Sequence, residues 1–251
     1  MGSRVDDMRT NPLRTKFEAH EPAIGCWLTS PSSVVAEVAA RVGFDYVCID
    51  MQHGLIDYSD VVPMLQALSL GEATATVRVP WNEPGIIGKV LDAGAMAVIV
   101  PMVNTAEQAA KALASGTYAP VGSRSTGPIR AMPLEGPDYH DNANEQCTII
   151  PMVETVEAID NLEGILSTPG VEVVYVGPAD LAVSMGFGRD CVEPEFLAAL
   201  DHVVTMCVEN GVVPAMHASP ATVQDRLARG FRMVTVQTDL NALTANLSES
   251  L

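Results

Sequence analysis

Basic residues are scarce in this sequence, which has 14 Lys and Arg against 31 Asp and Glu in 251 residues and a formal net charge of -17 at pH 7. A strongly negative chain repels the phosphates of nucleic acids and the headgroups of anionic lipids. We therefore expect neither a nucleic acid nor a membrane as a partner. An anionic substrate must instead meet a local positive charge, and the short supply of basic residues limits the candidates.

Long apolar runs and paired cysteines are lacking as well. No stretch reaches the roughly 18 uninterrupted apolar residues of a transmembrane helix, and residues 1–16 are polar, without the apolar part of a secretory leader. The five cysteines are odd in number and form no C-x-x-C pair, which argues against a disulfide framework or a zinc knuckle. These absences predict a cytoplasmic protein with free, buried thiols.

Glycine-rich nucleotide motifs are missing too. No G-x-G-x-x-G opens a helix after an expected strand, and no G-x-x-x-x-G-K-[ST] occurs. The segment Gly122–Gly127 could wrap a phosphate with its backbone amides, but it does not follow an expected strand, so a plain surface loop is the alternative. We expect no nucleotide cofactor.

Eight short runs rich in β-branched residues alternate with segments that carry apolar residues at helical spacing. This rhythm indicates βαβ units around a parallel sheet, and eight units predict an α/β fold, a (β/α)8 TIM barrel. The expected strands are Ile24–Leu28, Tyr46–Asp50, Thr74–Val79, Ala97–Pro101, Thr148–Val153, Val171–Val176, Val212–Met216 and Met233–Gln237.

One barrel domain is expected to account for residues 1–251, with residues 1–20 as a polar N-terminal segment. Residues 239–251 should form a C-terminal helix with an apolar stripe. That helix either covers its own barrel or is exchanged between subunits. The stretch Tyr118–Gln146 is too long for an idle connection, so we expect a structured excursion beside the barrel.

Polar residues that end the expected strands are the candidates for chemistry, because the active site of a TIM barrel lies at the carboxyl ends of its strands. This filter selects Asp50, Gln52, His53, Arg78, Glu154, Asp180 and His217.

Glu154 and Asp180 follow neighbouring strands, so their carboxylates should repel unless a proton or a cation neutralises them. Two oxygen ligands with room for water and substrate favour Mg2+ or Mn2+ over a structural zinc site. The alternative is that each carboxylate caps the helix that follows it.

Arg78 stands in the otherwise apolar run Thr-Val-Arg-Val-Pro, where a guanidinium is costly unless it meets an anion. Binding an anionic substrate is one interpretation, and a structural ion pair with Asp50 or Glu154 is the other. His53 lies at a junction between strand and loop, where it acts either as a general base or as a loop residue without a role.

Lysine decides whether an imine with a carbonyl substrate is possible, because an imine-forming enzyme needs an amine in the barrel mouth. The three lysines are Lys16, which precedes the first strand, and Lys89 and Lys111, which lie in expected outer helices. The sequence therefore argues against a Schiff-base mechanism.

Five motifs at strand or helix ends together resemble one family: Ile49–Gly54, Val77–Pro80, Leu91–Gly94, Pro151–Thr155 and Gly177–Leu181. The sequence is similar to the 4-hydroxy-2-oxoheptanedioate aldolases, which are class II pyruvate aldolases of the phosphoenolpyruvate/pyruvate barrel superfamily that also includes citrate lyase β subunits. The similarity extends from about Ala23 to Leu243, nearly the whole chain.

The resemblance implies a divalent metal cofactor, Mg2+, Mn2+ or Co2+, bound by Glu154 and Asp180. It implies that Arg78 contacts the keto oxygen of the 2-oxo acid and that His53 takes part in proton transfer. It also implies that Asp92 pairs with this histidine across a subunit contact.

The same resemblance implies that the backbone of Gly177, Pro178, Ala179 and Asp180 receives the substrate carboxylate. It further implies a homo-oligomer, a hexamer built as a trimer of dimers, in which the helix over residues 239–251 is exchanged between subunits.

Three departures from the family pattern are visible. Met152 stands where several relatives carry a glutamine that helps to hold the metal-bound substrate, and Gln52 replaces an acidic residue that some members have. The usual Tyr-Pro-Pro-x-Gly-x-Arg-Gly loop is replaced by the sequence of residues 118–125. These changes affect the substrate contacts and the loop rather than the core chemistry.

The sequence therefore predicts a metal-dependent aldolase that joins the enolate of pyruvate or hydroxypyruvate to an aldehyde and cleaves the resulting 4-hydroxy-2-oxo acid. One alternative is a decarboxylase or carbon–carbon lyase on oxaloacetate-like or acyl-CoA substrates, which would share the metal and the arginine. A second is a non-catalytic oligomeric binding barrel in which these charges form only a structural network.

Overall fold

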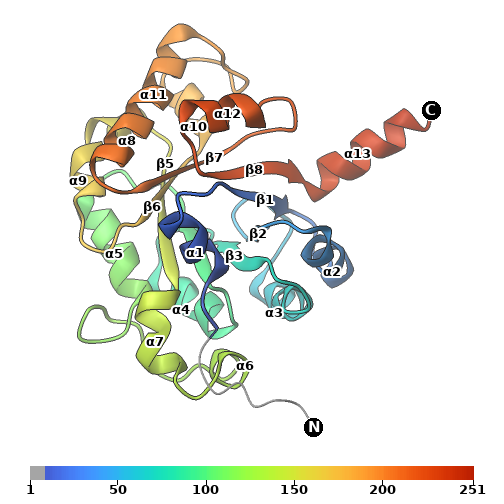
Figure 1. Ribbon diagram of the computed structural model, residues 1–251, viewed down its shortest axis with the longest axis vertical. Helices are drawn as coiled ribbons and strands as arrows, with labels where there is room; N and C mark the ends of the chain where they lie inside the picture. The colour runs from blue at the N-terminus through green and yellow to red at the C-terminus, as the bar shows by residue number, and fades with distance from the viewer. Residues whose placement is uncertain (1–8) are drawn as a thin grey trace.

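The computed structural model describes residues 9–251 and contains a ring of eight parallel strands (Figure 1). The strands are β1 (Ala23–Leu28), β2 (Tyr46–Asp50), β3 (Thr74–Arg78), β4 (Ala97–Val100), β5 (Thr148–Val153), β6 (Val173–Val176), β7 (Val213–His217) and β8 (Met233–Thr238). Each pairs with its neighbours in chain order, and β8 closes the barrel against β1. The predicted (β/α)8 TIM barrel is confirmed.

Helices follow the strands and surround them. They are α1 (Pro12–Glu18), α2 (Ser33–Val42), α3 (Tyr58–Leu68), α4 (Pro84–Asp92), α5 (Ala106–Gly116), α6 (Ala131–Glu135), α7 (Tyr139–Gln146), α8 (Val156–Asp160), α9 (Leu162–Leu166), α10 (Pro178–Ser184), α11 (Pro194–Glu209), α12 (Val223–Arg229) and α13 (Asp239–Glu249). Among the helices of residues 9–251, none has both the length and the apolar character needed to cross a membrane.

Local sequence explains where several helices begin and end. Ser32, Thr105 and Thr155 each accept a backbone N–H from the first turn of α2, α5 and α8. Gly43 and Gly230 end α2 and α12 with φ of 100° and 113°, a left-handed conformation that costs glycine little. Neither α1 nor α10 is expected from periodicity, because seven residues are too few to show one.

The N-terminal segment differs from its description as a polar tail. Residues 12–18 form α1, and its Leu13 is fully buried against the first residues of β1, β2, β4 and β8 at the amino ends of the strands. The buried Asn11 caps this helix and also binds Thr74 and the backbone of Met96. One apolar side chain thus closes the end of the barrel opposite the predicted site. Residues 1–8 of the segment lie outside the described part.

The excursion over residues 118–146 is structured, as predicted, and contains α6 and α7. Arg124 is buried between the rings of Tyr118 and Tyr139, donates to the Tyr139 hydroxyl at 3.0 Å and pairs with Asp92 at 2.7 Å. These contacts attach the segment to α4. Residues 122–127 do not border the cavity, and apart from the buried Arg124 they form a largely exposed loop without helix or strand.

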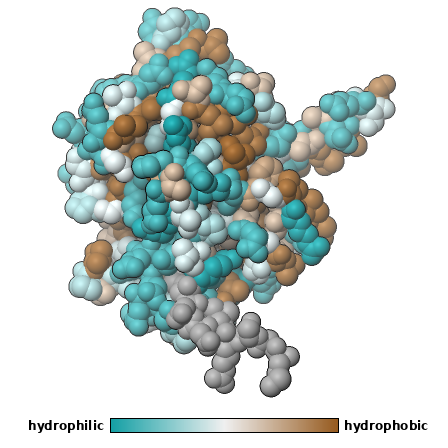
Figure 2. Space-filling model, in the orientation of Figure 1, coloured by the Kyte–Doolittle hydropathy of each residue, from teal (hydrophilic) through white to brown (hydrophobic). Residues whose placement is uncertain are grey.

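The C-terminal helix α13 extends away from the barrel (Figure 1), and none of its residues is buried. Leu240, Leu243 and Leu247 are 43%, 55% and 59% exposed. Figure 2 shows hydrophobic atoms on this projection and on the neighbouring face of the molecule. The expectation that this helix covers its own barrel is therefore wrong.

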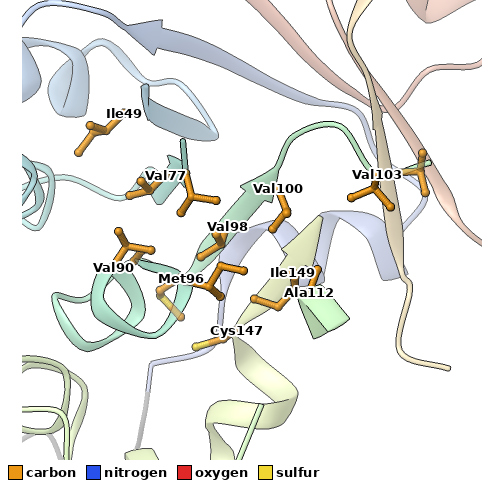
Figure 3. Close-up of a cluster of buried hydrophobic side chains, with 14 of the residues drawn as sticks. Ile49, Val77, Val90, Met96, Val98, Val100, Val103, Ala112, Cys147 and Ile149 are labelled. Atoms are coloured by element: carbon orange, nitrogen blue, oxygen red, sulfur yellow. The ribbon is translucent and has the colours of Figure 1, made fainter. Parts of the chain in front are cut away.

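The core lies between the barrel and its helices. Figure 3 shows part of it, where side chains of β3, β4 and β5 meet those of α4 and α5; examples are Val77, Val98, Ile149, Val90 and Ala112. A second buried layer fills the barrel interior and includes Trp27, Tyr46 and Tyr175. Both faces of each strand are covered, which explains the continuous apolar runs of the sequence.

All five cysteines are free. Cys26, Cys48, Cys147 and Cys207 are buried as expected, but Cys191 is partly exposed because it lies in the loop between α10 and α11.

Candidate active site

A cavity of about 660 Å³ opens at the carboxyl ends of the strands. It is bordered by residues from β1, β2, β3, β5, β6 and β7 and from α10, so the barrel brings together side chains that lie far apart in the sequence. Of the predicted site residues, His53, Arg78, Glu154, Gly177, Pro178, Ala179 and Asp180 line this cavity. Asp92 does not.

Arg78 ends β3 and forms a two-point ion pair with Asp50 at the end of β2. Its Nε donates to Oδ1 at 2.8 Å and its Nη2 to Oδ2 at 2.6 Å, while Asp50 also accepts the backbone N–H of Gln52 at 3.0 Å. Burial opposes ionisation of Asp50, but the hydrogen bonds and the charge of Arg78 hold its pKa below the ordinary value. Parallel pairing makes this contact possible, because Asp50 and Arg78 are direct partners in the register.

This ion pair leaves one end of the guanidinium available. The Nη1 of Arg78 contacts only Met152 Sδ at 4.0 Å among the described residues, and the guanidinium lies 5.0 Å from the centre of the Trp27 ring. A structural role and a substrate-binding role of Arg78 are therefore compatible, because Asp50 orients the guanidinium through Nε and Nη2 and leaves Nη1 for a ligand. Met152, for which the resemblance implies a glutamine in several relatives, thus lies beside Arg78.

Glu154 directly follows β5 and is 2% exposed. Its Oε1 accepts the backbone N–H of Met102 at 2.8 Å, and Met102 adopts φ of 55°, a conformation that non-glycine residues rarely take. The cap of α8 is Thr155 rather than Glu154. The alternative that Glu154 caps its helix is therefore wrong, because its carboxylate faces the cavity.

Asp180 lies in the first turn of α10, three residues after the Gly177 that begins it, and makes no capping hydrogen bond. Gly177 is needed because a side chain there would collide with Oε2 of Glu154. The two carboxylates are thus brought to one side of the cavity. Burial, together with the negative charge of Asp180, raises the pKa of Glu154 to about 7, although the Met102 N–H and Arg78 oppose this.

These residues fit a divalent cation. The buried carboxylate of Glu154 and the exposed carboxylate of Asp180 repel each other, and a cation between them removes that cost. No cluster of three or more His, Cys, Asp or Glu side chains suited to a metal occurs in residues 9–251. Two carboxylates with space for water and substrate are the donor set that Mg2+ and similar hard cations accept.

The two remaining predicted residues are placed differently. His53 is exposed at the mouth of the cavity, where its backbone N–H donates to Asp50 Oδ1 at 3.3 Å. Asp92 ends α4 outside the cavity and pairs with Arg124. Within one chain the structure does not bring His53 and Asp92 together.

Several cavity residues were not assigned a role from the sequence. Trp27 and Tyr175 are buried aromatic residues of β1 and β6. Both strands are continuous apolar runs, so the sequence does not show which side chains face the barrel mouth. Arg189 is an exposed cation in the loop after α10, at the rim. His217 ends β7 and was selected by the strand-end rule, but without a function.

No lysine lines the cavity. Lys16 pairs with Asp45, Lys89 lies over the Tyr58 ring, and Lys111 donates to the Asn82 carbonyl. All three are in the described part of the chain, so no amine is positioned for an imine with a 2-oxo acid.

A TIM barrel with two neighbouring carboxylates, the buried Glu154 and the exposed Asp180, and an oriented arginine at the carboxyl ends of its strands defines a lyase that acts through a stabilised enolate. Comparison with known proteins agrees with this class. Residues 23–245 match the HpcH/HpaI aldolase/citrate lyase family, and the chain belongs to that family. It is an aldolase, a carbon–carbon lyase, so the alternative of a non-catalytic barrel is rejected.

The chain is 40% identical to a hydroxypyruvate/pyruvate aldolase of Rhizorhabdus wittichii over 94% of this chain and 95% of the relative. It is 35% identical to a 4-hydroxy-2-oxo-heptane-1,7-dioate aldolase of Escherichia coli, over 96% and 93% of the two chains. The crystal structure of an aldolase/citrate lyase family protein from Burkholderia cenocepacia superposes with a TM-score of 0.91 at 33% identity, covering 96% of this chain and 98% of that one.

Proposed function

We propose that this aldolase forms and cleaves 4-hydroxy-2-oxo acids with a divalent cation, Mg2+, Mn2+ or Co2+, held by Glu154 and Asp180. The nucleophile is the enolate of pyruvate or hydroxypyruvate, and the acceptor is an aldehyde. The observation that carries the proposal is the free Nη1 of Arg78, which faces the same cavity as the carboxylate pair.

When bound, the cation supplies a Lewis acid that polarises the keto group of the 2-oxo acid. Arg78 donates Nη1–H to the keto oxygen, where negative charge develops as C3 loses its proton. Asp50 holds the guanidinium in place for this, and the backbone of Gly177–Asp180 receives the substrate carboxylate. A donor that is oriented before the reaction stabilises the charge without rearranging.

His53 is the proposed proton carrier, because it borders the cavity and an imidazole can both accept and donate a proton. The C3–H bond breaks, its electron pair forms the C2–C3 double bond, and the keto oxygen carries the charge. The new bond then joins C3 to the aldehyde carbon, and the aldehyde oxygen takes a proton to become the 4-hydroxyl. Cleavage runs these steps in reverse.

Exchange of C3 protons tests the proposal without an aldehyde. The protein, supplied with Mg2+ in heavy water, should incorporate deuterium at C3 of pyruvate or hydroxypyruvate, which can be followed by proton NMR. A screen of aldehydes with both acids then identifies the acceptor. Absence of exchange with either acid would contradict an enolate mechanism.

Metal binding should depend on pH through Glu154. Because the pKa of its carboxyl is about 7, a cation must displace a proton below that pH, so Mg2+ affinity should fall by about tenfold per pH unit from 7 to 5.5 and level off above 7. Calorimetric titration at several pH values measures this. Glu154→Gln should remove the dependence together with most of the affinity, and a constant affinity from pH 5.5 to 8 would contradict the prediction.

The raised pKa of Glu154 also affects the stability of the metal-free protein. The pKa of this carboxyl is higher in the folded chain than its ordinary 4.5, so the unfolded chain binds fewer protons between these values. Stability of the metal-free protein should therefore fall as pH rises from about 4.5 to about 7, and added Mg2+ should offset this loss.

We further propose a homo-oligomer, a hexamer built as a trimer of dimers, in which α13 packs on a neighbouring subunit. Support comes from its lack of buried residues and from Val34, Val38 and Val42 of α2, which are 69%, 61% and 63% exposed at helical spacing. Such an assembly is also what the proposed contact between Asp92 and His53 requires. The free thiols support a cytoplasmic location.

Deletion of residues 242–251 tests the exchange of α13. This cut keeps Asp239, whose carboxylate accepts hydrogen bonds from Thr29 and Ser30 and so secures the end of β8. The deletion should reduce the assembly to smaller species by light scattering, because it removes Leu243 and Leu247 of the apolar stripe. Leu243→Lys with Leu247→Lys should do the same without shortening the chain. An unchanged mass in both variants would refute the exchange.

A further inference from the structure

His217 ends β7 and lines the cavity, yet the proposed reaction leaves it without a role. Its ring meets Trp27 edge-on, with ring centroids 4.9 Å apart at an angle of 69°. Its Nδ1 lies 3.4 Å from the hydroxyl of Tyr175. The other ring nitrogen, Nε2, has no hydrogen-bond partner within residues 9–251, so a polar atom of the cavity wall is available to a ligand.

Buried hydroxyl groups determine which nitrogen of His217 carries the proton. The Tyr46 hydroxyl lies 2.7 Å from Thr235 Oγ1, and the Tyr175 hydroxyl lies 2.8 Å from the same atom. Tyr46 is fully buried, and its hydroxyl lies beside both Thr235 Oγ1 and the Tyr175 hydroxyl. The 2.7 Å contact directs its proton to Thr235 Oγ1. The Thr235 proton then goes to the Tyr175 oxygen, and the Tyr175 proton goes to Nδ1 of His217.

The opposite direction of this chain is unfavourable. If Nδ1 donated to Tyr175, each hydroxyl would pass its proton inward, and the proton of Tyr46 would have only the Tyr175 oxygen as an acceptor, although that oxygen would already accept Nδ1–H. The contacts therefore favour the tautomer of His217 with hydrogen on Nε2.

The imidazole is also neutral at the pH at which aldolases are assayed. Burial and the nearby charge of Arg78 lower the pKa of His217 to about 4, although Asp50 opposes the shift. A neutral ring with Nδ1 occupied as an acceptor has one function left toward the cavity, which is donation from Nε2–H. It cannot act as a base there.

The substrate atoms that need this donor follow from the proposed function, on which the inference rests. The carboxylate and keto oxygen of the 2-oxo acid already have partners at Arg78, at the cation and at the start of α10. Arg78 and His217 border the same indole, that of Trp27, so a three-carbon acid held at Arg78 reaches the histidine as well. The part of the acid without a polar partner is its C3 group.

We infer that the Nε2–H of His217 donates a hydrogen bond to an oxygen carried on C3 of the 2-oxo acid, and that His217 thereby selects 3-hydroxy-2-oxo acids, such as hydroxypyruvate, over pyruvate. Pyruvate has only a methyl group at this place and leaves the donor unpaired. A site that binds one substrate hydroxyl through a neutral hydrogen bond favours that substrate by about tenfold.

The selectivity is measured as the ratio of C3 deuterium exchange rates, kcat/KM for hydroxypyruvate over pyruvate, with Mg2+ and without an aldehyde. His217→Phe keeps a ring against Trp27 but has no donor, and it should lower this ratio by about tenfold relative to wild type. His217→Gln places an amide N–H at a similar distance from the backbone and should recover part of the ratio.

Tyr175→Phe removes the hydroxyl that fixes the tautomer. Long-range nitrogen–proton NMR of the histidine-labelled, Mg2+-loaded protein should show His217 with its hydrogen on Nε2 in wild type and a mixture of tautomers in Tyr175→Phe. The resonance is identified by its loss in His217→Phe. A merely structural tyrosine would not change this spectrum.

Two results would overturn the inference. One is an unchanged exchange rate, or an equally reduced one, with both acids in His217→Phe. A change of selectivity seen only when an aldehyde is present has the same meaning, because Nε2–H of His217 then binds the aldehyde rather than the 2-oxo acid. The other is a wild-type spectrum with hydrogen on Nδ1. If wild type exchanges C3 protons of neither acid, the proposed function itself fails.

Discussion

Removal of divalent cations with excess chelator should abolish both aldol cleavage and C3 exchange, and Mg2+, Mn2+ or Co2+ should restore them. The expected loss is at least about a thousandfold, because a Lewis acid contributes several kcal/mol of charge stabilisation and each 1.36 kcal/mol is tenfold in rate. The reason lies in the charge balance of the site, in which Glu154 and Asp180 repel each other beside one guanidinium.

Substitution of the carboxylates separates this loss from damage to the fold. Glu154→Gln keeps the shape of the side chain and an oxygen that can accept the Met102 N–H, but it removes the buried charge. It should remove most of the cation affinity and the activity while leaving the thermal unfolding temperature of the metal-free protein unchanged or higher at pH 8. Asp180→Asn should behave similarly.

A matched control uses the exposed Glu157 in the first turn of α8, where Glu157→Gln removes one charge near the site without touching the cavity. This variant should keep wild-type activity and Mg2+ affinity. Full wild-type activity after exhaustive chelation, verified by metal analysis of the protein, would contradict the class II assignment.

Arg78→Ala should lose aldol cleavage and C3 exchange together, each by about 100- to 1000-fold, because both reactions pass through the same enolate and one oriented donor is worth this much in rate. Arg78→Lys should recover only part of the loss. A single ammonium cannot bind both oxygens of Asp50 and still present a donor at the position of Nη1.

Arg78 also stabilises the fold through its ion pair with Asp50, so a loss of activity in Arg78→Ala must be separated from unfolding. Its removal leaves Asp50, 1% exposed, without its cationic partner, and breaking a buried pair in this way costs about 3–5 kcal/mol. The double variant Asp50→Asn with Arg78→Met removes both charges and should fold more stably than Arg78→Ala, yet remain equally inactive. Loss of activity is then assigned to the missing donor rather than to unfolding.

Two measurements accompany the rates: thermal unfolding and Mg2+ affinity. Near wild-type exchange in an Arg78→Ala protein that is folded and binds Mg2+ would mean that the arginine serves only its ion pair with Asp50. His53→Ala provides the contrast, since a proton carrier that water can replace should leave measurable exchange when cleavage has fallen.

The barrel and the positions of its polar residues are determined by the sequence alone. Strands buried on both faces need continuous apolar runs, so a charged residue that ends such a run marks the barrel mouth. This logic located Arg78, Glu154 and Asp180, and it worked because all three lie within four residues of the end of a strand. Short helices such as α1, α6 and α10 were not expected from the periodicity of the sequence.

The contacts between side chains, in contrast, depend on the tertiary structure. Asp50 and Arg78 are 28 residues apart, and their pairing follows from the register of β2 and β3, which no local pattern reveals. The tautomer proposed for His217 depends on Tyr46, far earlier in the chain, because closing β8 against β1 and β7 places Thr235 between Tyr46 and Tyr175. Local sequence determines which residues form a strand and which face is apolar, whereas contacts across a closed barrel exist only after all eight strands have taken their register.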